Sequence, residues 1–328
     1  MNIAVIGDGG WGTTLAILLC GKGMKVSLWG AFPDYIKTIK ITRENVKFLP
    51  GVILPDNITI VSDVKVALNG AEVVVLAVPS QYMREVLLKI KKDVPKGALI
   101  VSVSKGIENK TLMRMSEVIF DVLGKPELAV LSGPSISYEV AREIPTTVVA
   151  VSKKERTAKK VQDIFITEKF RVYTGTDIVG VELGGALKNV VAIAAGICDG
   201  MGFGANAKAA LLTRGLVEIA RLGATMGAKR ETFYGLSGLG DLVTTCVSPH
   251  GRNRWFGEEI GKGRKRNEIE SETEMVIEGI ATAKSAYELA KKHKVDMPIT
   301  GQIYSILYES KNPKEAVKEL MTRQKKAE

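Results

Sequence analysis

A glycine-rich turn near the start of the chain constrains the fold more than any other feature. Gly7, Gly9 and Gly12 form this turn. The strand-like run Ile3–Ile6 precedes it, and an apolar helical pattern begins at Trp11. Glycines at this spacing allow a tight turn, a close approach to a pyrophosphate and tight helix–strand packing, with the anion at the helix N-terminus. The pattern predicts a dinucleotide-binding unit, and a glycine turn without a ligand is the alternative.

Strand-like and helical runs alternate through the first part of the chain. The strand-like runs are Ile3–Ile6, Lys25–Trp29, Ile58–Val61, Val73–Val78, Leu99–Ser104, Leu128–Leu131, Thr147–Val151 and Arg171–Thr174. Helical patterns occupy Trp11–Cys20, Tyr82–Lys92, Leu112–Leu123 and Glu155–Ile166. Several strand-like runs are almost entirely Val, Ile and Leu, as expected for strands buried on both faces of a parallel sheet. The alternation predicts an α/β fold with a Rossmann-like doubly wound sheet over residues 1–180.

The texture changes after about Gly180, where Gly and Ala become dense and helical periodicity replaces the strand-like runs. Val190–Ala195 and Ala209–Leu222 are apolar enough to predict fully buried helices. Amphipathic spacing predicts two more helices, over Glu274–His293 and Lys314–Met321. Residues 181–328 are therefore predicted to form an all-helical C-terminal domain.

Composition excludes several classes of protein. The 328 residues are 45% hydrophobic and 25% charged, as in ordinary globular proteins, and the net charge of +10 follows from 46 basic and 36 acidic residues. Three distant cysteines and two histidines predict neither a disulfide framework nor a metal site. No uncharged apolar run approaches the roughly 18 residues of a membrane span, and the N-terminus is strand-like, not a signal peptide. We expect a cytoplasmic protein without membrane insertion.

Lys188 is the most unusual charged residue, because it is the only one between Leu183 and Cys198. A lysine in such apolar surroundings must be paired, must have a shifted pKa, or must meet an anionic ligand. Together with a dinucleotide loop, it suggests a proton-transfer group in an enzyme. A structural lysine paired with Glu182 or Asp241 is the alternative.

Further polar groups follow predicted strands or lie in glycine-rich segments. The candidates are Ser80, Lys105, the Ser132–Ser135 turn, Asp241 in a glycine-rich loop, and the basic run Arg252–Arg254. Strand ends in such sheets face the ligand crevice, and arginine and asparagine suit a phosphate. Ser80 as a helix N-cap, Lys105 as a solvated loop residue and Arg252–Arg254 as an exposed basic turn are the alternatives. Nucleic-acid binding is disfavoured because no aromatic residues are interleaved with the basic run.

The sequence leaves the choice between NAD and NADP open. An acid that binds the ribose hydroxyl of NAD is expected after the second strand, or an arginine for the phosphate of NADP. Gly30, Ala31 and Phe32 occupy this place, and Asp34 is the nearest acid. Asp8 lies inside the phosphate loop, where its charge opposes the pyrophosphate unless the side chain points outward.

Together these motifs resemble one family along essentially the whole chain. They are GDGGWGTTLA at 7–16, VPS at 78–80, SKGIE at 104–108, GPS at 133–135, GALKNVVAIAAGICDGMGFGANAKAALLTRGLVEIARLG at 185–223, GLGDLVTTC at 238–246, RNR at 252–254, EGIATA at 278–283 and MPI at 297–299. The chain closely resembles the bacterial-type NAD(P)-dependent glycerol-3-phosphate dehydrogenases. It departs from the family's usual pattern at Asp8, at Gly30 and Ala31, where arginine or histidine is usual, and at Gly251, where many members have serine.

The resemblance implies a Rossmann domain, a helical domain like that of 6-phosphogluconate dehydrogenase, and a homodimer. The implied activity interconverts dihydroxyacetone phosphate and sn-glycerol 3-phosphate, which supplies glycerophospholipid synthesis. The implied catalytic residues are Lys188, Asp241 and Lys105. The implied substrate-binding residues are Lys105, Gly133, Ser135, Asp241, Gly251, Arg252 and Asn253. The implied cofactor-binding residues are Gly7, Gly9, Gly10, Trp11, Gly12, Lys105, Ser137, Arg252, Ile277 and Glu278.

Three other functions are compatible with parts of the sequence. One is a related two-domain dehydrogenase that acts on another phosphorylated or carboxylated hydroxy compound. Another is a dinucleotide sensor without catalysis, which the presence of both Lys188 and Asp241 disfavours. A nucleic-acid binder is the third and is the least favoured.

Overall fold

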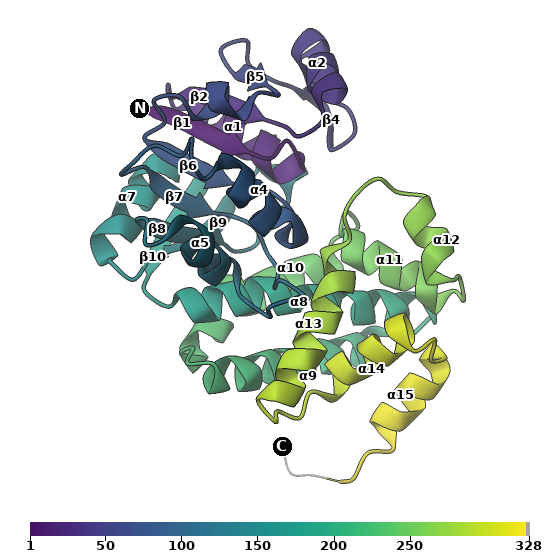
Figure 1. Ribbon diagram of the computed structural model, residues 1–328. Helices are drawn as coiled ribbons and strands as arrows, with labels where there is room; N and C mark the ends of the chain where they lie inside the picture. The colour runs from purple at the N-terminus through teal and green to yellow at the C-terminus, as the bar shows by residue number, and fades with distance from the viewer. Residues whose placement is uncertain (326–328) are drawn as a thin grey trace. The chain divides into compact units, whose positions relative to one another are not determined.

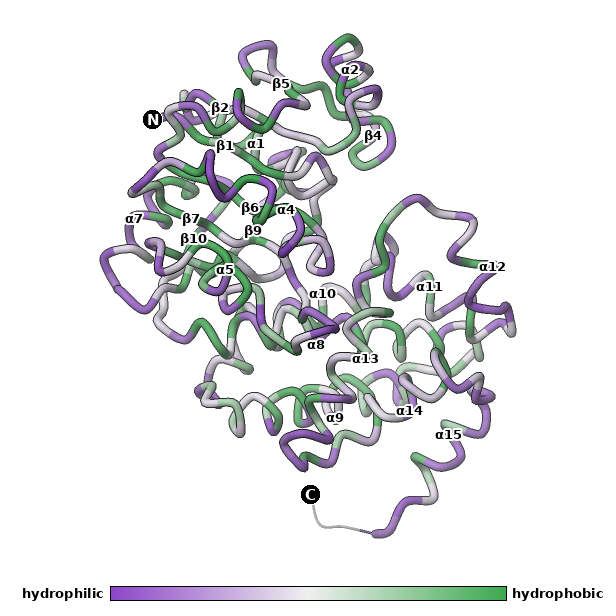
Figure 2. The backbone as a smooth tube through the Cα atoms, in the orientation of Figure 1, coloured by the Kyte–Doolittle hydropathy of each residue, from purple (hydrophilic) through white to green (hydrophobic). Residues whose placement is uncertain are grey.

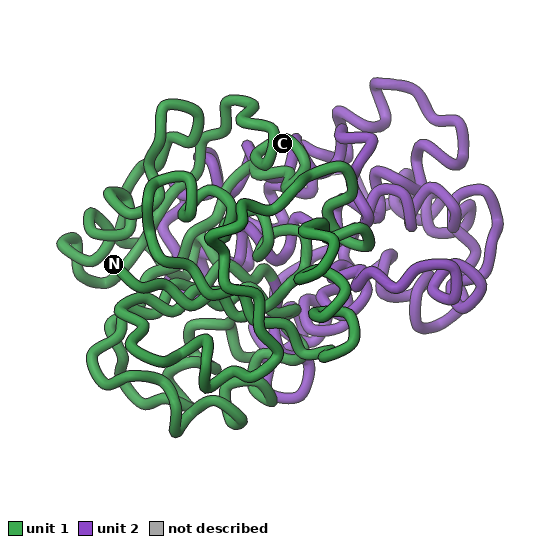
Figure 3. Tube along the Cα trace, turned by 90° about the horizontal axis from the view of Figure 1, so that it is seen from above, with its two compact units in different colours: residues 1–105, 113–182 green, residues 106–112, 183–328 purple. Residues whose placement is uncertain are grey.

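The computed structural model describes residues 1–325, whose elements are shown in Figure 1. The chain forms two compact units, coloured separately in Figure 3. Unit 1 comprises residues 1–105 and 113–182, and unit 2 comprises residues 106–112 and 183–328. The division lies close to the boundary expected from sequence at residue 180. The assignment of the short segment 106–112 to unit 2 was not expected.

Unit 1 is built on a sheet of eight strands, all within residues 1–182. They are β1 (Asn2–Ile6), β2 (Lys25–Trp29), β5 (Thr59–Val61), β6 (Val73–Leu76), β7 (Leu99–Ser102), β8 (Leu128–Ser132), β9 (Thr146–Val151) and β10 (Phe170–Gly175). Their order is β10-β9-β8-β7-β6-β1-β2-β5, and only the β8–β9 pair is antiparallel among these strands. Each strand predicted from sequence is present, and the strands are mainly hydrophobic (Figure 2).

Helices cover both faces of this sheet, which confirms the doubly wound fold. The unit contains α1 (Gly10–Gly21), α2 (Pro33–Thr42), α3 (Val64–Leu68), α4 (Met83–Ile90), α5 (Met115–Leu123), α6 (Ser137–Val140) and α7 (Glu155–Phe165). Side chains from α1, α2 and α7 share one buried cluster with Ile3 and Val5 of β1. Side chains from α3, α4 and α5 share a second cluster with Ala4 and Ile6. Alternate residues of β1 therefore pack against the helices on opposite faces of the sheet.

A small hairpin between α2 and β5 was not predicted from the sequence. It consists of β3 (Glu44–Asn45) and β4 (Leu49–Ile53), which pair antiparallel outside the main sheet. The strands are short, and Pro50 interrupts the apolar alternation that marks a strand. The hairpin brings Asn45 to the phosphate loop, where it donates hydrogen bonds to the backbone oxygen of Asp8 and to Thr13 Oγ1, each over 2.7 Å.

Unit 2 is helical, as predicted. With the long helix α8 (Ile178–Gly200), which begins in unit 1, it contains α9 (Ala205–Thr225), α10 (Asp241–Val247), α11 (Arg252–Gly261), α12 (Arg266–Ser271), α13 (Glu278–Lys292), α14 (Pro298–Tyr308) and α15 (Pro313–Met321). Helix α8 is long and apolar enough to cross a membrane, but 94% of its most apolar window is buried inside the protein, as in a core helix.

The expectation of a fully buried helix over Ala209–Leu222 is wrong. This run lies in α9, where Ala209, Ala210 and Thr213 are exposed and Leu216, Ile219 and Leu222 are buried. Apolar composition does not reveal which side of a helix has neighbours. The expected helix over Val190–Ala195 is buried throughout within α8.

Backbone-to-backbone packing joins α8 and α11. Gly196 and Gly200 lie one turn apart on α8, and Gly257 and Gly261 lie one turn apart on α11. A Cβ on Gly196 would lie 1.9 Å from the carbonyl oxygen of Arg254, and one on Gly257 would lie 2.0 Å from that of Ile193. Only glycine permits this approach. The crossing fixes the start of α11 relative to the part of α8 that carries Lys188.

Candidate active site

The phosphate loop has the geometry that a pyrophosphate requires. Gly7 has a φ of +120°, and a Cβ there would lie 2.6 Å from the oxygen of Ala77. A Cβ on Gly12 would lie 1.9 Å from the oxygen of Gly7, so helix and strand pack in contact. Apart from its two chain neighbours, no atom of residues 1–325 lies within 4 Å of the Cβ position on Gly9, and Gly9, the N-cap residue of α1, has no side chain to cap the helix. The loop therefore leaves open space at a helix N-terminus, which fits a dinucleotide phosphate.

Three other predicted cofactor residues lie around the start of α1. A Cβ on Gly10 would lie 2.5 Å from the oxygen of Phe48 and 3.7 Å from Cβ of Ser137. Thr14 Oγ1 donates a 3.1 Å hydrogen bond to the backbone oxygen of Ser137. Trp11, in the first turn of α1, is half-buried. The fold thus brings Gly10, Trp11 and Ser137 together within unit 1.

Asp8 is turned toward the end of β2. Its side chain is buried, and its Cγ lies 2.5 Å from the position that a Cβ on Gly30 would occupy. The sequence left the direction of this side chain open. In the structure the carboxylate lies beside Gly30, not in the open space next to Gly9.

A second group of predicted residues lies at the ends of β7 and β8. Lys105 Nζ donates a 3.0 Å hydrogen bond to the backbone oxygen of Gly133. Ser135 Oγ donates to the same oxygen over 2.9 Å, and Gly133 itself has a φ of +134°. These contacts place the Lys105 ammonium beside the Gly133–Ser135 turn, so Lys105 is not simply a solvated loop residue.

Lys188 is the centre of a buried polar cluster in unit 2. Its ammonium donates hydrogen bonds to the carboxylate of Asp241 and, over 2.5 Å, to Thr245 Oγ1. Lys188 is 7% exposed and Asp241 1% exposed. Of the two partners that the sequence allowed, Asp241 makes the ion pair, whereas Glu182 binds Arg114. If either group moved away, the other would remain as an uncompensated buried charge, which is strongly destabilising. The ion pair therefore holds both groups in place.

The segment before α10 sets the position of Asp241. Residues Leu236–Gly240 form a single π-helical turn, and Asp241 is the first residue of α10 instead of a loop residue as expected. A Cβ on Gly184 of α8 would lie 2.6 Å from the oxygen of Ser237, so the turn lies against α8. Thr245 follows one helical turn after Asp241 and therefore shares its face. Thr245 was not predicted as a site residue, although its spacing from Asp241 could have indicated it.

Asn253 connects three helices of unit 2. Its Nδ2 donates to Asn189 Oδ1 over 3.0 Å, and its Oδ1 accepts a 2.9 Å hydrogen bond from the backbone N–H of Gly279. Asn189, which follows Lys188 on α8, was not proposed as a site residue. A Cβ on Gly251 would lie 2.9 Å from the oxygen of Thr245, so glycine here permits a close approach to the Lys188 cluster.

Arg252 begins α11 and is exposed, with Nη1 donating to the backbone oxygen of Val276 over 3.1 Å. Ile277 and Glu278 follow Val276, and α13 begins at Glu278. Gly251, the N-cap residue of α11, has no side chain that could cap this helix N-terminus. Arg252 and this helix terminus together favour an anion.

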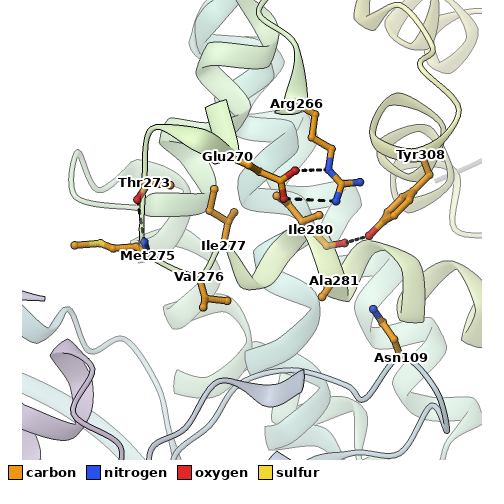
Figure 4. A pocket seen from close by; sticks show the side chains of 10 residues that line it. All are labelled: Asn109, Arg266, Glu270, Thr273, Met275, Val276, Ile277, Ile280, Ala281 and Tyr308. Atoms are coloured by element: carbon orange, nitrogen blue, oxygen red, sulfur yellow. Dashed lines mark hydrogen bonds and ion pairs between the residues drawn. The ribbon is translucent and has the colours of Figure 1, made fainter. Parts of the chain in front are cut away.

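A separate pocket of about 340 Å³ lies elsewhere in unit 2 (Figure 4). It is lined by Asn109, Arg266, Glu270, Thr273, Met275, Val276, Ile277, Ile280, Ala281 and Tyr308. Arg266 Nε pairs with Glu270 over 2.9 Å, and the Tyr308 hydroxyl donates to the oxygen of Ile280 over 2.8 Å. Of the predicted site residues only Ile277 lines it, so this pocket is distinct from the Lys188 cluster. Within residues 1–325, no group of three His, Cys, Asp or Glu side chains could hold a metal ion.

The fold and these clusters define a class, the two-unit nicotinamide-dependent dehydrogenases, in which a Rossmann unit is followed by a helical unit that carries a buried lysine. Two family models match the chain, NAD-dependent glycerol-3-phosphate dehydrogenase N-terminus at residues 2–158 and C-terminus at residues 177–318. The chain belongs to the NAD(P)-dependent glycerol-3-phosphate dehydrogenase family.

Relatives and a solved structure agree over the full length. The glycerol-3-phosphate dehydrogenase [NAD(P)+] of Prosthecochloris aestuarii is 52% identical over 331 aligned positions, which cover 100% of both chains. That of Chlorobium phaeobacteroides is 50% identical and covers 100% of this chain and 99% of its own. A crystal structure of glycerol-3-phosphate dehydrogenase from Coxiella burnetii superposes with a TM-score of 0.95 at 39% identity, over 98% of this chain and 99% of that one.

Proposed function

We propose that the protein interconverts dihydroxyacetone phosphate and sn-glycerol 3-phosphate with NAD(P)H or NAD(P)+, and that Lys188 is its acid–base group. The observation that carries this proposal is the buried ammonium of Lys188, paired with Asp241 and Thr245. A lysine in an apolar helix that is held by a carboxylate and a hydroxyl has a fixed donor direction. Such a group suits proton transfer to a single oxygen atom.

A nicotinamide dinucleotide held by the phosphate loop would supply or accept the hydride at the carbon that carries the reacting oxygen. In the direction of reduction, the Lys188 ammonium donates a proton to the ketone oxygen and is left as a neutral amine. The amine regains its proton from solvent before the next cycle. In the direction of oxidation, the amine takes the proton of the secondary alcohol. Asp241 and Thr245 keep Nζ in place through both directions.

The substrate phosphate is assigned to the start of α11. Arg252 offers a planar guanidinium there, and the first N–H groups of the helix point toward the same end. Asn253, engaged with Asn189 and Gly279, holds this end of α11 against α8 and α13. Lys105 adds positive charge where oxygen becomes negative as hydride arrives. Gly133, Ser135 and Gly251 border the substrate in this proposal.

The cofactor is assigned to the open side of the phosphate loop. Gly7, Gly9, Gly10, Trp11 and Gly12 hold its phosphates, with Ser137 beside them. Lys105, Arg252, Ile277 and Glu278 complete the proposed cofactor contacts.

Steady-state turnover tests the proposal. Dihydroxyacetone phosphate should be reduced with NADH and NADPH, and the Lys188→Met variant should lose at least about 100-fold in kcat, as general acid catalysis supplies roughly this factor. Lys125→Met, which removes a charge from an exposed position, is the matched control and should retain activity. Turnover of 6-phosphogluconate with none of dihydroxyacetone phosphate would favour the related dehydrogenase. Near-wild-type kcat in Lys188→Met would remove the acid–base role.

We also propose that the protein is a cytoplasmic homodimer that supplies glycerol 3-phosphate for glycerophospholipid synthesis. The family resemblance and the Gly- and Ala-rich helices of unit 2, which permit close packing, support the dimer. Light scattering on the purified protein should give twice the 35.4 kDa chain mass. A monomeric mass across the concentrations used for the kinetics would contradict the dimer.

A further inference from the structure

The end of β2 lacks the group that normally recognises the adenosine ribose. In a Rossmann unit an acid at this place accepts a hydrogen bond from the ribose 2′-hydroxyl, and an arginine nearby accommodates a 2′-phosphate. Residues 30–32 are Gly, Ala and Phe, so neither group is present in this turn. Asp34, in the first turn of α2, is exposed.

The Asp8 carboxylate occupies the place where a side chain on residue 30 would begin. A Cβ on Gly30 would lie 2.4 Å from Cδ1 of Ile36, 2.5 Å from Asp8 Cγ and 2.6 Å from Asp8 Oδ2. The pairing of β1 with β2 produces this proximity, because Ile6 lies opposite Trp29 and the N–H of Gly7 donates to the oxygen of Trp29. A larger residue at position 30 would collide with the Asp8 carboxylate and with the end of the Ile36 side chain. The buried position of the Asp8 carboxylate therefore depends on residue 30 being a glycine.

Hydrogen bonds, one of them from the β3–β4 hairpin, hold the backbone of Asp8 in place. Its carbonyl oxygen accepts hydrogen bonds from Thr13 Oγ1 over 3.2 Å and from Asn45 Nδ2 over 2.7 Å. Asn45 Oδ1 in turn accepts a 2.7 Å hydrogen bond from the Tyr35 hydroxyl. These bonds fix the direction in which the side chain leaves the loop.

Asp8 Oδ2 is buried and has no hydrogen-bond partner among residues 1–325. The side chain is 9% exposed, and burial raises the pKa of this carboxyl above its usual value. A buried acceptor without a donor is costly, and a hydroxyl donor from a ligand would remove that cost. Asp8 Oδ2 is thus an acceptor without a donor near the end of β2, where a Rossmann fold usually has the acid that binds the ribose.

We propose that Asp8 replaces the acid that β2 lacks, accepting a hydrogen bond from the ribose 2′-hydroxyl of NAD(H) and disfavouring the 2′-phosphate of NADP(H). The phosphate would bring additional negative charge to a buried carboxylate, and residues 30–32 offer no cation to offset the repulsion. The proposal rests on binding of a nicotinamide dinucleotide by unit 1 and does not depend on the identity of the substrate.

Direct titration without substrate tests the proposal. The dissociation constants of NADH and NADPH are measured by nicotinamide fluorescence for the wild type, Asp8→Asn and Asp8→Ala. The wild type should bind NADH more tightly, and each variant should reduce the NADPH/NADH ratio of dissociation constants by about tenfold or more, because a charge-assisted hydrogen bond is lost and a repulsion removed. Asp34→Asn, the matched control, removes one acidic charge at the exposed neighbour and should leave the ratio unchanged.

A double variant separates the role of the carboxylate from a role in folding. Asp8→Ala combined with Gly30→Asp returns an acid to the end of β2 and should restore the preference for NADH. A wild type that prefers NADPH, an unchanged ratio in Asp8→Asn, or an equal effect of Asp34→Asn would overturn the proposal. Selective NADH binding without turnover of dihydroxyacetone phosphate would support it and contradict the proposed function instead.

Discussion

The Lys188 ammonium has two partners of different kinds, a carboxylate from Asp241 and a hydroxyl from Thr245. The carboxylate compensates the charge, whereas the hydroxyl contributes direction because it lies one helical turn further along α10. A hydrogen bond that involves a charged group, such as this ammonium, is worth about 1.5–3 kcal/mol. Loss of the hydroxyl should therefore weaken the positioning of Nζ without removing its charge.

Thr245→Val is expected to lower kcat by about tenfold while the KM for dihydroxyacetone phosphate changes little, since roughly 1.4 kcal/mol corresponds to a factor of ten. Steady-state kinetics measures both parameters. Thr244→Val changes the preceding residue in the same way and serves as the control. Equal kcat in the two variants would show that the hydroxyl of Thr245 does not position Lys188.

At the scale of elements, the start of α14 depends on a buried carboxylate from α9. Glu218 accepts hydrogen bonds from the backbone N–H groups of Ile299 and Thr300, over 2.7 and 3.1 Å, and from the Thr300 hydroxyl. Burial raises the pKa of Glu218 to about 7 from 4.5, and these hydrogen bonds oppose part of that rise. The group therefore binds more protons in the folded than in the unfolded chain between these pH values.

This difference predicts how stability varies with pH. The contribution of Glu218 to the free energy of unfolding is fully present below pH 4.5 and is lost as the pH rises through about 7. The full change is about 3 kcal/mol, at roughly 1.4 kcal/mol per pKa unit. Urea unfolding across this range should show a smaller pH dependence in Glu218→Gln than in the wild type. The exposed control Glu309→Gln should match the wild type, and an identical slope in all three proteins would contradict the assignment.

A second prediction at the scale of elements concerns the glycine contact between α8 and α11. Gly196→Ala would place a Cβ 1.9 Å from a backbone oxygen, so the helices must separate. We expect a loss of about 2–3 kcal/mol in the free energy of unfolding, measured by urea denaturation. Gly21→Ala, at the end of α1, is the control: apart from the neighbouring residues and the backbone of α1, no atom of residues 1–325 lies within 4 Å of its Cβ position, so stability should be unchanged or slightly increased. Equal effects at both sites would show that the crossing is not close-packed.

At the scale of the whole molecule, the net charge of +10 should assist the capture of an anionic substrate. Added salt screens this attraction over a distance of about 10 Å at 0.1 M. The kcat/KM for dihydroxyacetone phosphate should therefore fall as sodium chloride is added, while kcat at saturating substrate stays constant. Initial rates at low and saturating substrate measure the two quantities. A constant kcat/KM would show that the charge lies too far from the site to act.

Local patterns predicted much of the architecture. Each strand of the main sheet and the four helices expected in unit 1 leave a continuous signal in neighbouring residues, so periodicity was sufficient. The β3–β4 hairpin was missed because its short strands carry no such signal. The burial of Ala209–Leu222 was overestimated because the neighbours of a helix come from distant parts of the chain.

Some residues of the candidate site could likewise be predicted from local sequence, and others could not. Lys188 was conspicuous because it interrupts an apolar run, and Gly7, Gly9 and Gly12 because their spacing is local. The choice between Glu182 and Asp241 as its partner could not be made from sequence. Asp241 is 53 residues away along the chain, and only the packing of α10 on α8 brings the two charges together.

By itself, the sequence determined the doubly wound sheet, the helical second unit, the phosphate loop and the presence of one costly buried ammonium, because each depends on residues close together in the chain. The tertiary structure alone decided which carboxylate compensates Lys188, that Thr245 joins it, and that Asp8 lies against Gly30. These contacts join segments that are distant in sequence. Their geometry follows from strand pairing and helix packing, which no local pattern encodes.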